Sequence, residues 1–411
     1  MRDYSPEKEQ AFFDLFLDYF DSEKDAGKQH DPGNYTLDRM TPLAELGGHP
    51  EKSLKIIHIA GTKGKGTTST FTSSLLVSAG KSVGLFTSPH LCTVRERFQE
   101  NGHLVSYERL MAVSQPYLAK IKAAGLHPSL FELFTIIALK LFVEDGMEYA
   151  VLETGIGGRV DSTNYIPHPL VTAITPVSFD HMALLGHTIE AIASEKAGIL
   201  KPGVPLVLAR QPFAAGEATI RARAAQVGAP VLSPCPDDCC QGFVPDTMPK
   251  FLHDNFTVAR AIVQALGISP QPEHFQPPEL RARFEKIHTN PTVLLDGAHN
   301  ADSMQKLVSA LQECYPGERW NVVLGCVKGK DVSGMVKALA ELPEAQFILT
   351  NPHTGKGSAL DVLRHEATVQ GLHVIADIPD LQRRDQLPQE RSLLFTGSFF
   401  TASIGESLFG K

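Results

Sequence analysis

A glycine-rich segment with two lysines, residues 61–68 (Gly-Thr-Lys-Gly-Lys-Gly-Thr-Thr), has the residue types that bind phosphate. Glycines let backbone N–H groups converge on phosphate oxygens, and the start of a following helix adds a partial positive charge. Lys65 can place a cation on the β- and γ-phosphates, and Thr67 a hydroxyl near a bound magnesium ion. The strict Walker pattern fails, because Gly66 follows Lys65 and Ile59 stands where the first glycine belongs. A strand before the segment and a helix after it nevertheless predict a nucleotide-binding P-loop.

Three further segments carry side chains suited to a divalent metal ion. Residues 87–91, 153–161 and 180–186 each follow a predicted strand, and they contain Ser88, Glu153 and His181. Because the carboxyl ends of parallel strands meet at one edge of a sheet, a hydroxyl, a carboxylate and an imidazole would gather beside the triphosphate. Magnesium prefers oxygen ligands. Taken singly, each residue also fits a turn, an ion pair or a hydrogen-bonded histidine, and only the shared edge favours a metal site.

Short β-branched runs alternate with helical stretches along most of the chain. We predict strands at residues 55–60, 83–86, 149–152, 170–174, 205–208, 293–295, 322–324, 347–349 and 393–395. We predict helices at residues 9–20, 67–79, 131–144, 188–197 and 301–314, with Gly80 just past the end of the second. Four prolines between residues 267 and 278 predict a linker. The fold class is therefore α/β: a P-loop domain with a mainly parallel sheet (1–277) and a smaller C-terminal Rossmann-like domain (278–411).

The composition excludes several classes of protein. The 411 residues are 43% hydrophobic and 20% charged, which excludes collagen-like, coiled-coil and wholly disordered chains. With 38 Lys plus Arg against 46 Asp plus Glu, the net charge is −8, which disfavours binding to nucleic acid or to an anionic membrane. No apolar run reaches the roughly 18 residues of a membrane span, and the charged N-terminus does not resemble a signal peptide. We therefore expect a cytoplasmic enzyme.

Six cysteines are present, and three of them crowd a segment rich in proline and aspartate: Cys235, Cys239 and Cys240. A zinc site would need a second ligand pair at regular spacing, and none follows in the sequence. The sequence therefore favours a reduced surface loop at this segment over a metal or redox site.

Several of these motifs, in order, resemble those of the folylpolyglutamate synthase/dihydrofolate synthase family of the Mur ligase superfamily. The resemblance spans about residues 43 to 400 and rests on segments 61–67, 87–91, 96–98, 153–161, 180–181, 195–199 and 296–300. It implies ATP-dependent amide formation: ATP phosphorylates a carboxylate of folate or dihydropteroate, and the amine of L-glutamate displaces the phosphate. It also implies two magnesium ions and a monomeric enzyme.

The resemblance implies roles for individual residues of this sequence. ATP would be bound by Gly61, Thr62, Gly64, Lys65, Gly66, Thr67, Thr68, Asn255, Arg283 and Asp296. Ser88 and Glu153 would bind one magnesium ion, and Glu153, His181 and Lys196 a second. Since a cationic amine cannot bind a metal, Lys196 would be carbamylated by carbon dioxide; together with Lys65 and His181 it forms the implied catalytic set. The implied substrate residues are Phe131 and Glu132 for the pterin and His299 and Ser398 for glutamate.

This sequence departs from the family pattern at four places. Lys63 stands where asparagine is usual, which adds a positive charge beside the phosphates. Arg281-Ala282 replaces a usual Pro-Gly before Arg283, which predicts a less rigid turn. His253-Asp254 changes the approach to Asn255 and weakens the adenine assignment, and Ser129 replaces threonine beside the implied pterin site. Whether dihydropteroate is a substrate therefore stays open at this point.

Two other functions compete with this interpretation. A peptidoglycan-precursor ligase of the same superfamily carries a substantial N-terminal domain for its UDP-sugar, and we expect none here because only 60 residues precede Gly61. A regulatory P-loop protein without ligase chemistry would need one metal and no amine site. The set of Glu153, His181 and Lys196, together with a second domain, argues against it.

Overall fold

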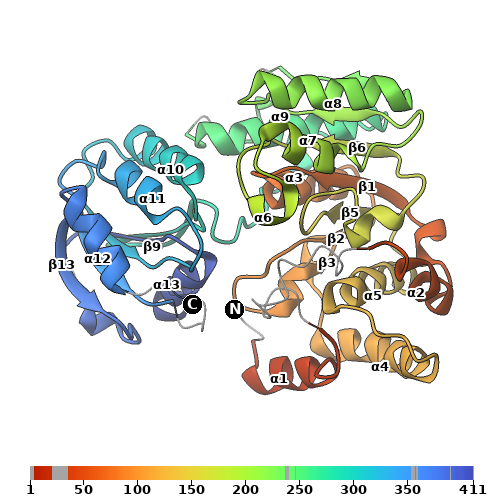
Figure 1. Ribbon diagram of the computed structural model, residues 1–411, viewed down its shortest axis with the longest axis horizontal. Helices are drawn as coiled ribbons and strands as arrows, with labels where there is room; N and C mark the ends of the chain where they lie inside the picture. The colour runs from red at the N-terminus through yellow and green to blue at the C-terminus, as the bar shows by residue number, and fades with distance from the viewer. Residues whose placement is uncertain are drawn as a thin grey trace. The chain divides into compact units, whose positions relative to one another are not determined.

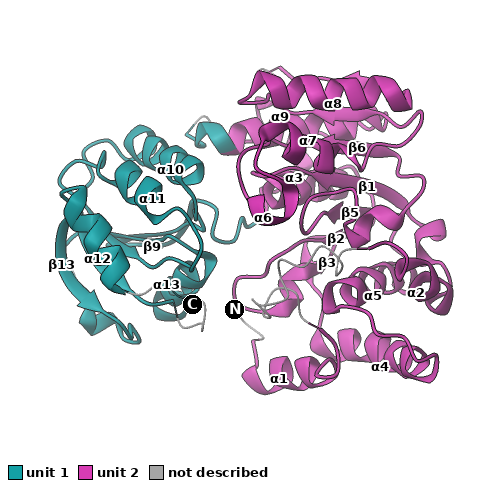
Figure 2. Cartoon of the chain, viewed as in Figure 1, with its two compact units in different colours: residues 1–3, 246–251, 279–411 teal, residues 4–245, 252–278 magenta. Residues whose placement is uncertain are grey.

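The computed structural model describes residues 4–20, 36–236, 240–245, 247–352, 357, 360–388 and 390–410. The chain divides into two compact units, which Figure 2 colours separately. Unit 2 comprises residues 4–245 and 252–278, and unit 1 comprises residues 1–3, 246–251 and 279–411. The short segment 246–251 thus belongs with the C-terminal part of the chain.

Unit 2 is built on a mainly parallel sheet (Figure 1). In the described part of the chain it has eight strands in the order β4-β3-β2-β5-β1-β6-β7-β8, with β3 and β4 antiparallel to their neighbours. Its strands are β1 (Lys55–Ala60), β2 (Val83–Phe86), β3 (Phe98–Glu100), β4 (His103–Leu104), β5 (Tyr149–Glu153), β6 (Val171–Ile174), β7 (Leu206–Leu208) and β8 (Val231–Leu232). The central strand β1 is buried from Ile56 to Ala60, as a strand covered on both faces requires.

Helices cover this sheet on both sides. They are α1 (Pro6–Asp14), α2 (Met40–Gly47), α3 (Lys65–Ser78), α4 (Tyr107–Ala123), α5 (Leu130–Glu144), α6 (Met182–Leu185), α7 (Ile189–Ala197), α8 (Ala214–Val227) and α9 (Lys250–Ala265). Two of the predicted helices have wrong boundaries. Helix α1 begins at Pro6, because Ser5 caps it and accepts a hydrogen bond from Lys8 N, and it ends at Asp14 rather than at residue 20. Helix α3 begins at Lys65, so Lys65 and Gly66 lie in its first turn.

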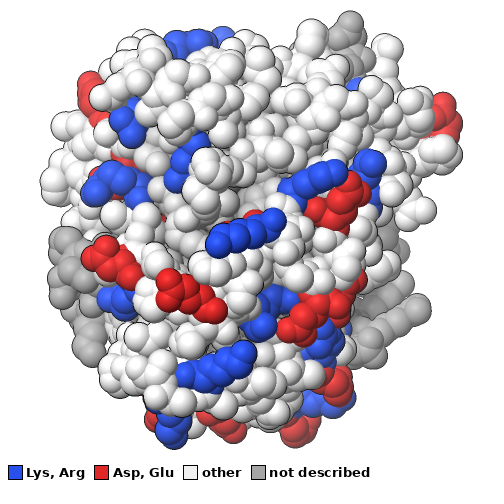
Figure 3. All heavy atoms as spheres, turned by 90° about the vertical axis from the view of Figure 1, so that its right-hand side faces the viewer, with Lys and Arg blue, Asp and Glu red and all other residues white. Residues whose placement is uncertain are grey.

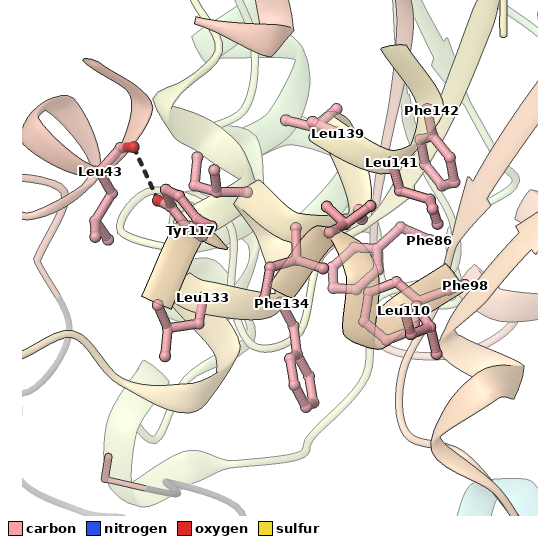
Figure 4. Close-up of a cluster of buried hydrophobic side chains, with 14 of the residues drawn as sticks. Leu43, Phe86, Phe98, Leu110, Tyr117, Leu133, Phe134, Leu139, Leu141 and Phe142 are labelled. Carbon is pink, nitrogen blue, oxygen red and sulfur yellow. Dashed lines mark hydrogen bonds between the residues drawn. The ribbon is translucent and has the colours of Figure 1, made fainter. Parts of the chain in front are cut away.

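The core that α1, α2, α4 and α5 form with the sheet is mainly aliphatic, with aromatic rings packed among the aliphatic side chains (Figure 4). Helix α5 is apolar on nearly all sides and lies between other helices and β2, so it is buried along most of its length. The ring of Phe134 lies near those of Phe16 and Phe98, with centroids 5.3 and 5.5 Å away. The buried Tyr117 hydroxyl donates a hydrogen bond to the Leu43 carbonyl, which satisfies its polar atom inside the core.

Replacing Phe134 by alanine should lower the free energy of unfolding by about 3–5 kcal/mol, because it leaves a cavity in an aromatic cluster. The Phe134 side chain is 2% exposed, whereas Leu17 is 76% exposed. Leu17→Ala is therefore the matched control, with an expected change within about 0.5 kcal/mol. Urea unfolding followed by circular dichroism measures both variants. Equal losses for the two would contradict the packing described here.

Unit 1 is a second α/β layer structure. In its described residues the sheet order is β13-β12-β11-β14-β10-β9, parallel except for β9. Its strands are β9 (Glu285–Thr289), β10 (Thr292–Leu295), β11 (Trp320–Leu324), β12 (Gln346–Thr350), β13 (His373–Ile378) and β14 (Ser392–Thr396). Its helices are α10 (Ala301–Cys314), α11 (Val332–Leu339), α12 (Leu360–Val369) and α13 (Phe399–Phe409). The fold class predicted from the sequence, two α/β domains with mainly parallel sheets, is confirmed.

The segments around the cysteines and the prolines are packed more tightly than the sequence suggests. Cys235 and Cys240 are buried, so a surface position is wrong for both, while Cys239 lies outside the described residues. The proline-rich residues 267–278 pack on unit 2 through Phe275, whose ring lies 5.5 Å from that of Phe256.

No helix in the described part of the chain is both long enough and apolar enough to span a membrane. On the face drawn in Figure 3, basic and acidic side chains are interspersed rather than gathered by sign.

Candidate active site

Residues 61–68, which we call the glycine–lysine loop, connect β1 to α3 and require glycine at two positions. Gly61 has φ +146°, and a Cβ there would lie 1.9 Å from the Thr175 hydroxyl oxygen. Gly64 has φ +81°, and a Cβ there would lie 2.2 Å from Asn255 Oδ1. Both φ values lie in the left-handed region, which glycine adopts without a side-chain clash. The loop therefore packs directly against β6 and against α9.

The loop is also tied to the segment after β6. The backbone N–H groups of Thr62 and Lys63 both donate to the Pro176 carbonyl, at 3.0 and 3.1 Å. Thr62 Oγ1 donates to the Ser178 carbonyl and accepts from Ser178 N, each at 3.1 Å. These four hydrogen bonds fix residues 176–178 against the loop, and thereby place Asp180 and His181, which follow shortly after, beside it.

Glu153, at the end of β5, is a buried carboxylate beside the glycine–lysine loop. It is 3% exposed, accepts a hydrogen bond from Ser88 N at 3.0 Å through Oε2, and lies 3.9 Å from Lys65 Nζ through Oε1. A Cβ on Gly66 would approach Glu153 Oε2 to 3.3 Å, so the first turn of α3 packs against this carboxylate. The structure thus brings Lys65, Ser88 and Glu153 together, from the ends of three different strands.

Lys196 reaches the same loop from the last turn of α7. Its Nζ donates to the Gly61 carbonyl at 2.7 Å, and the residue is 4% exposed. Burial is the main cause that lowers the pKa of the Lys196 amine to about 7, and the positive charge of Lys65 adds to it. Asp180 opposes this shift. A buried lysine with a depressed pKa beside a glycine-rich loop is a candidate for chemistry rather than for solvation.

Asp180 and His181 form the fourth element of this cluster. The Asp180 carboxylate lies 3.4 Å from Lys63 Nζ and accepts a hydrogen bond from His181 N. His181 begins α6 with φ +50°, a left-handed conformation that is uncommon for residues other than glycine, and its side chain is 38% exposed. Lys63 therefore pairs with Asp180, the residue before the predicted metal ligand His181.

The donor set at this edge suits a hard cation. Glu153 offers a carboxylate that accepts a hydrogen bond from the Ser88 backbone N–H and lies 3.9 Å from Lys65 Nζ, and the hydroxyls of Ser88 and Thr67 stand on the adjoining segments. Oxygen ligands of this kind are those that magnesium and manganese take in nucleotide sites. Among the described residues, no three His, Cys, Asp or Glu side chains are grouped closely enough to hold a metal by themselves. Such a metal would therefore depend on hydroxyls and phosphate oxygens as well.

The two residues predicted for the pterin lie on α5 and face different surroundings. The Phe131 ring packs over Gly155, where a Cβ would lie 2.8 Å from the ring, and its centroid is 5.7 Å from that of Phe86. The Glu132 carboxylate accepts from Ser129 N at 2.7 Å in a capping box and pairs with both Arg39 Nε and Arg39 Nη2. Glu132 thus has a local role at the start of α5, which the Ser-x-x-Glu spacing at residues 129–132 could have indicated.

Asp161 is a buried carboxylate that the sequence-based list of site residues omitted. It accepts hydrogen bonds from Ile156 N and Thr163 N, both at 3.0 Å, and so fixes the loop that follows Glu153. Burial raises the pKa of Asp161, and the hydrogen bonds it accepts oppose that rise. The Thr163 hydroxyl lies between Asp161 and His58 Nε2, the latter at 2.7 Å. The short Asp-x-Thr spacing at residues 161–163 is the signal that could have indicated this role.

The remaining predicted residues lie in unit 1, at the carboxyl edge of its sheet. Asp296 and His299 follow β10, and Ser398 follows the adjacent parallel strand β14. A hydrogen bond from Gly397 N to the Ala298 carbonyl, 3.0 Å long, joins the two segments. Ser398 caps α13, accepting from Thr401 N and donating to the Gly325 carbonyl at 3.0 Å. His299 Nδ1 lies 2.9 Å from the Gly297 carbonyl.

Arg283 and Asp296 are neighbours in the same unit. The Arg283 guanidinium lies 4.3 Å from the centroid of the Phe399 ring, a cation–π geometry. Asp296 is buried and accepts from Phe284 N and Ala298 N, both at 2.8 Å. Burial raises the pKa of Asp296, and the positive charge of Arg283 opposes that rise. Unit 1 thus presents an arginine, a carboxylate, a histidine and a serine at one sheet edge.

Comparisons with known proteins show which proteins this chain is similar to. Residues 282–399 match the family model described as "Mur ligase, glutamate ligase domain". The dihydrofolate synthase/folylpolyglutamate synthase of Bacillus subtilis is 35% identical over 346 residues, which are 75% of this chain and 79% of that protein. The folylpolyglutamate synthase of Mycobacterium tuberculosis, solved with ADP and AMPPCP, superposes with a TM-score of 0.80 at 25% identity, covering 92% of this chain and 96% of that one.

A third relative was solved with ligands. A bifunctional folylpolyglutamate synthase/dihydrofolate synthase with manganese, AMPPNP and L-glutamate bound superposes with a TM-score of 0.77 at 26% identity, covering 91% of this chain and 94% of that chain.

Proposed function

The chain belongs to the folylpolyglutamate synthase/dihydrofolate synthase family of ATP-dependent ligases, and from that membership we propose which of its residues perform each step. The enzyme joins L-glutamate to a folate at the expense of ATP. The observation that carries the assignment of roles is the convergence of Glu153 and Lys196 on the glycine–lysine loop, which carries Lys65. Residues 1–277 supply the ATP-binding P-loop domain, and residues 278–411 supply the C-terminal ligase domain.

ATP is bound through the glycine–lysine loop. The residues assigned to it there are Gly61, Thr62, Gly64, Lys65, Gly66, Thr67 and Thr68, with Asn255 toward the adenine. Lys65, at the positive end of α3, neutralises the β- and γ-phosphate oxygens as charge shifts between them. Asn255 lies on α9 and packs against Gly64 of the loop. This contact supports the assignment of Asn255 to the adenine.

The reaction proceeds in two steps on the substrate. A carboxylate oxygen of the folate attacks the γ-phosphorus of ATP, the bond to the bridging oxygen breaks, and ADP leaves with that electron pair. The neutral amine of L-glutamate then attacks the acyl carbon, phosphate leaves, and a proton is lost from nitrogen to give the amide. Fixing the reactants in line lowers the barrier by removing the entropy cost of their encounter.

Two magnesium ions are assigned to this site, one at Ser88 and Glu153 and one at Glu153, His181 and Lys196. When bound, they screen the negative charge of the transferring phosphoryl group. Glu153 is held for this task by the hydrogen bond from Ser88 N, and His181 by the contacts of its loop with Thr62 and Lys63.

Lys196 serves as a ligand only after it reacts with carbon dioxide. The neutral amine attacks the carbon of CO2, an N–C bond forms, and one proton leaves the nitrogen, so that the side chain ends in a carbamate with two oxygens. A pKa of about 7 supports this proposal, since a large fraction of the amine is neutral near pH 7 whereas an ordinary lysine is almost fully protonated.

Unit 1 supplies further contacts. Arg283 and Asp296 are assigned to the nucleotide, and His299 and Ser398 to the incoming glutamate.

The pterin is assigned to two residues of α5 in unit 2, Phe131 and Glu132. Phe131 offers a flat apolar surface over Gly155, and Glu132 acts through its bond to Arg39. We propose that the same residues also accept dihydropteroate, so that the enzyme acts as a dihydrofolate synthase as well. It works as a monomer in the cytoplasm, and its net charge of −8 disfavours nucleic acid and anionic membranes as partners.

Phosphate release tests this assignment. With ATP and magnesium, tetrahydrofolate should support release only when L-glutamate is present, and dihydropteroate should do the same. The controls omit the acceptor, glutamate or both. Release independent of acceptor and glutamate would instead indicate a nucleotide hydrolase. Release with tetrahydrofolate alone among the acceptors would remove the dihydrofolate synthase activity from the proposal.

A further inference from the structure

The turn that carries Arg283 has an unusual backbone. Ala282 has φ +47° and Phe284 has φ +51°, and both are residues with a Cβ. The left-handed region is unfavourable for such residues, because Cβ crowds the following carbonyl oxygen. Two of these residues flank Arg283 within one turn, so the turn adopts this shape only if its surroundings hold it there.

Two carboxylates hold the turn through its backbone. Glu285 Oε2 accepts a hydrogen bond from Ala282 N at 2.7 Å, and Asp296 Oδ2 accepts one from Phe284 N at 2.8 Å. The Ala282 carbonyl in turn accepts from Gly297 N at 2.9 Å. Each of the two residues with positive φ therefore has its N–H fixed by a carboxylate.

Arg281 fixes one of these carboxylates. Its Nη1 lies 2.7 Å from Glu285 Oε1, and its Nη2 lies 2.8 Å from Glu406 Oε1 on α13. The Glu285 and Glu406 side chains are 13% and 6% exposed, so both charges are largely removed from water. Burial raises the pKa of Glu285, and the positive charge of Arg281 opposes that rise.

The guanidinium of Arg283 emerges from this turn toward the site edge of unit 1. It lies over the Phe399 ring, in the first turn of α13, directly after Ser398. Helix α13 also carries Glu406, so the aromatic ring under Arg283 and the carboxylate that anchors Arg281 belong to one rigid element. Arg281 and Arg283 are thereby linked both through the backbone of the turn and through α13.

We propose that Arg281, Glu285 and Glu406 form a clamp of positioning residues that sets the direction of Arg283 for the ligase reaction. The proposal rests on the role assigned to Arg283 under the proposed function. The clamp touches neither nucleotide nor glutamate in this assignment, and acts by holding Ala282 in its left-handed conformation. If these three residues only stabilised the fold, replacing Ala282 by glycine would not restore activity to the Arg281→Ala variant.

The test is a rescue experiment in the full chain. Arg281→Ala should lower kcat/KM for ATP by about 10- to 100-fold, because a displacement of the order of 1 Å of a phosphate ligand has effects of that size. Adding Ala282→Gly to the Arg281→Ala variant should recover at least about a third of the loss in the logarithm of kcat/KM, since glycine adopts positive φ without the Cβ penalty. The assay is glutamate-dependent release of phosphate over a range of ATP concentrations.

A matched control separates positioning from stability. Glu344 also has positive φ, +52°, in unit 1, and it pairs with Arg319 at 3.0 Å through side chains that are both 64% exposed. Glu344→Gly therefore relieves the same kind of backbone strain away from the turn and should not rescue Arg281→Ala. Equal rescue by both glycines, or no rescue by Ala282→Gly, would overturn the proposal. If Arg281→Ala does not fold, Glu406→Gln, which keeps the shape of the side chain, takes its place in the same scheme.

Arg283→Ala distinguishes failure of this inference from failure of the proposed function. A full loss of activity in Arg283→Ala together with wild-type activity in Arg281→Ala would reject the clamp alone. Wild-type activity in Arg283→Ala would reject the role of Arg283 itself, and the clamp with it.

Discussion

Replacing Lys65 by alanine should lower kcat for glutamate ligation by at least about 10²–10³-fold, the usual cost of removing one preorganised charge from a transition state. Lys65 stands in the first turn of α3, and its Nζ lies 3.9 Å from the Glu153 carboxylate. In the variant only backbone N–H groups and the helix dipole would remain to neutralise the β- and γ-phosphates. Phosphate release at saturating substrates measures kcat, and calorimetric titration with ATP measures binding.

Lys81→Ala is the matched control for this variant. It removes one lysine charge just after the other end of α3, and it should leave kcat within about twofold. Turnover of Lys65→Ala within about tenfold of the unchanged enzyme would contradict the assigned role.

Replacing Lys196 by alanine should abolish ligation while ATP still binds. The Lys196 amine is buried, bonded to the Gly61 carbonyl and has a pKa of about 7. Because this pKa is lowered, the amine becomes neutral as pH rises through about 7, so carbamate formation and activity should rise over the same range. Enzyme labelled with ¹³C-bicarbonate should show a carbamate resonance by NMR, and the resonance should be absent from Lys196→Ala.

Lys201→Ala provides the comparison, since burial also lowers the pKa of Lys201 but its Nζ donates to the Asn164 carbonyl away from the loop. That variant should keep both the carbamate resonance and activity within about threefold. An unchanged rate in Lys196→Ala would show that the modification has no part in the reaction, whereas loss of ATP binding would assign Lys196 to the nucleotide instead.

The buried strands were predictable because their side chains face apolar surroundings on both sides. The run Lys55 to Ala60 is β-branched and apolar, and the structure has β1 over the same residues. Strands β9 and β13 were missed because they lie at sheet edges, where more exposed and less exposed side chains alternate. The sequence of β13 (His-Val-Ile-Ala-Asp-Ile) accordingly mixes polar and apolar residues in one run. Helix α4 was missed as well; it contains Pro116, which sequence patterns take as a helix end.

The candidate site was predictable where its residues follow strands. Ser88, Glu153 and the glycine–lysine loop stand at the ends of β2, β5 and β1, and parallel strands place these ends together. The residues that hold the site in place were harder to predict from the sequence, because their contacts join segments that are distant along the chain. The pairing of Lys63 with Asp180 spans 117 residues, and the Arg39–Glu132 pair spans 93.

The path of the chain has a consequence for any work with fragments. Phe251 packs against Phe284, with ring centroids 6.3 Å apart, and Cys314 contacts the Thr247 carbonyl. Phe251 and Thr247 nevertheless come before residues 252–278, which belong to the other unit. A recombinant C-terminal piece that begins at residue 279 would therefore lack an aromatic neighbour of the very residue that follows Arg283. Designs for expressing that half alone, or for splitting and relinking the gene, should graft residues 247–251 onto it.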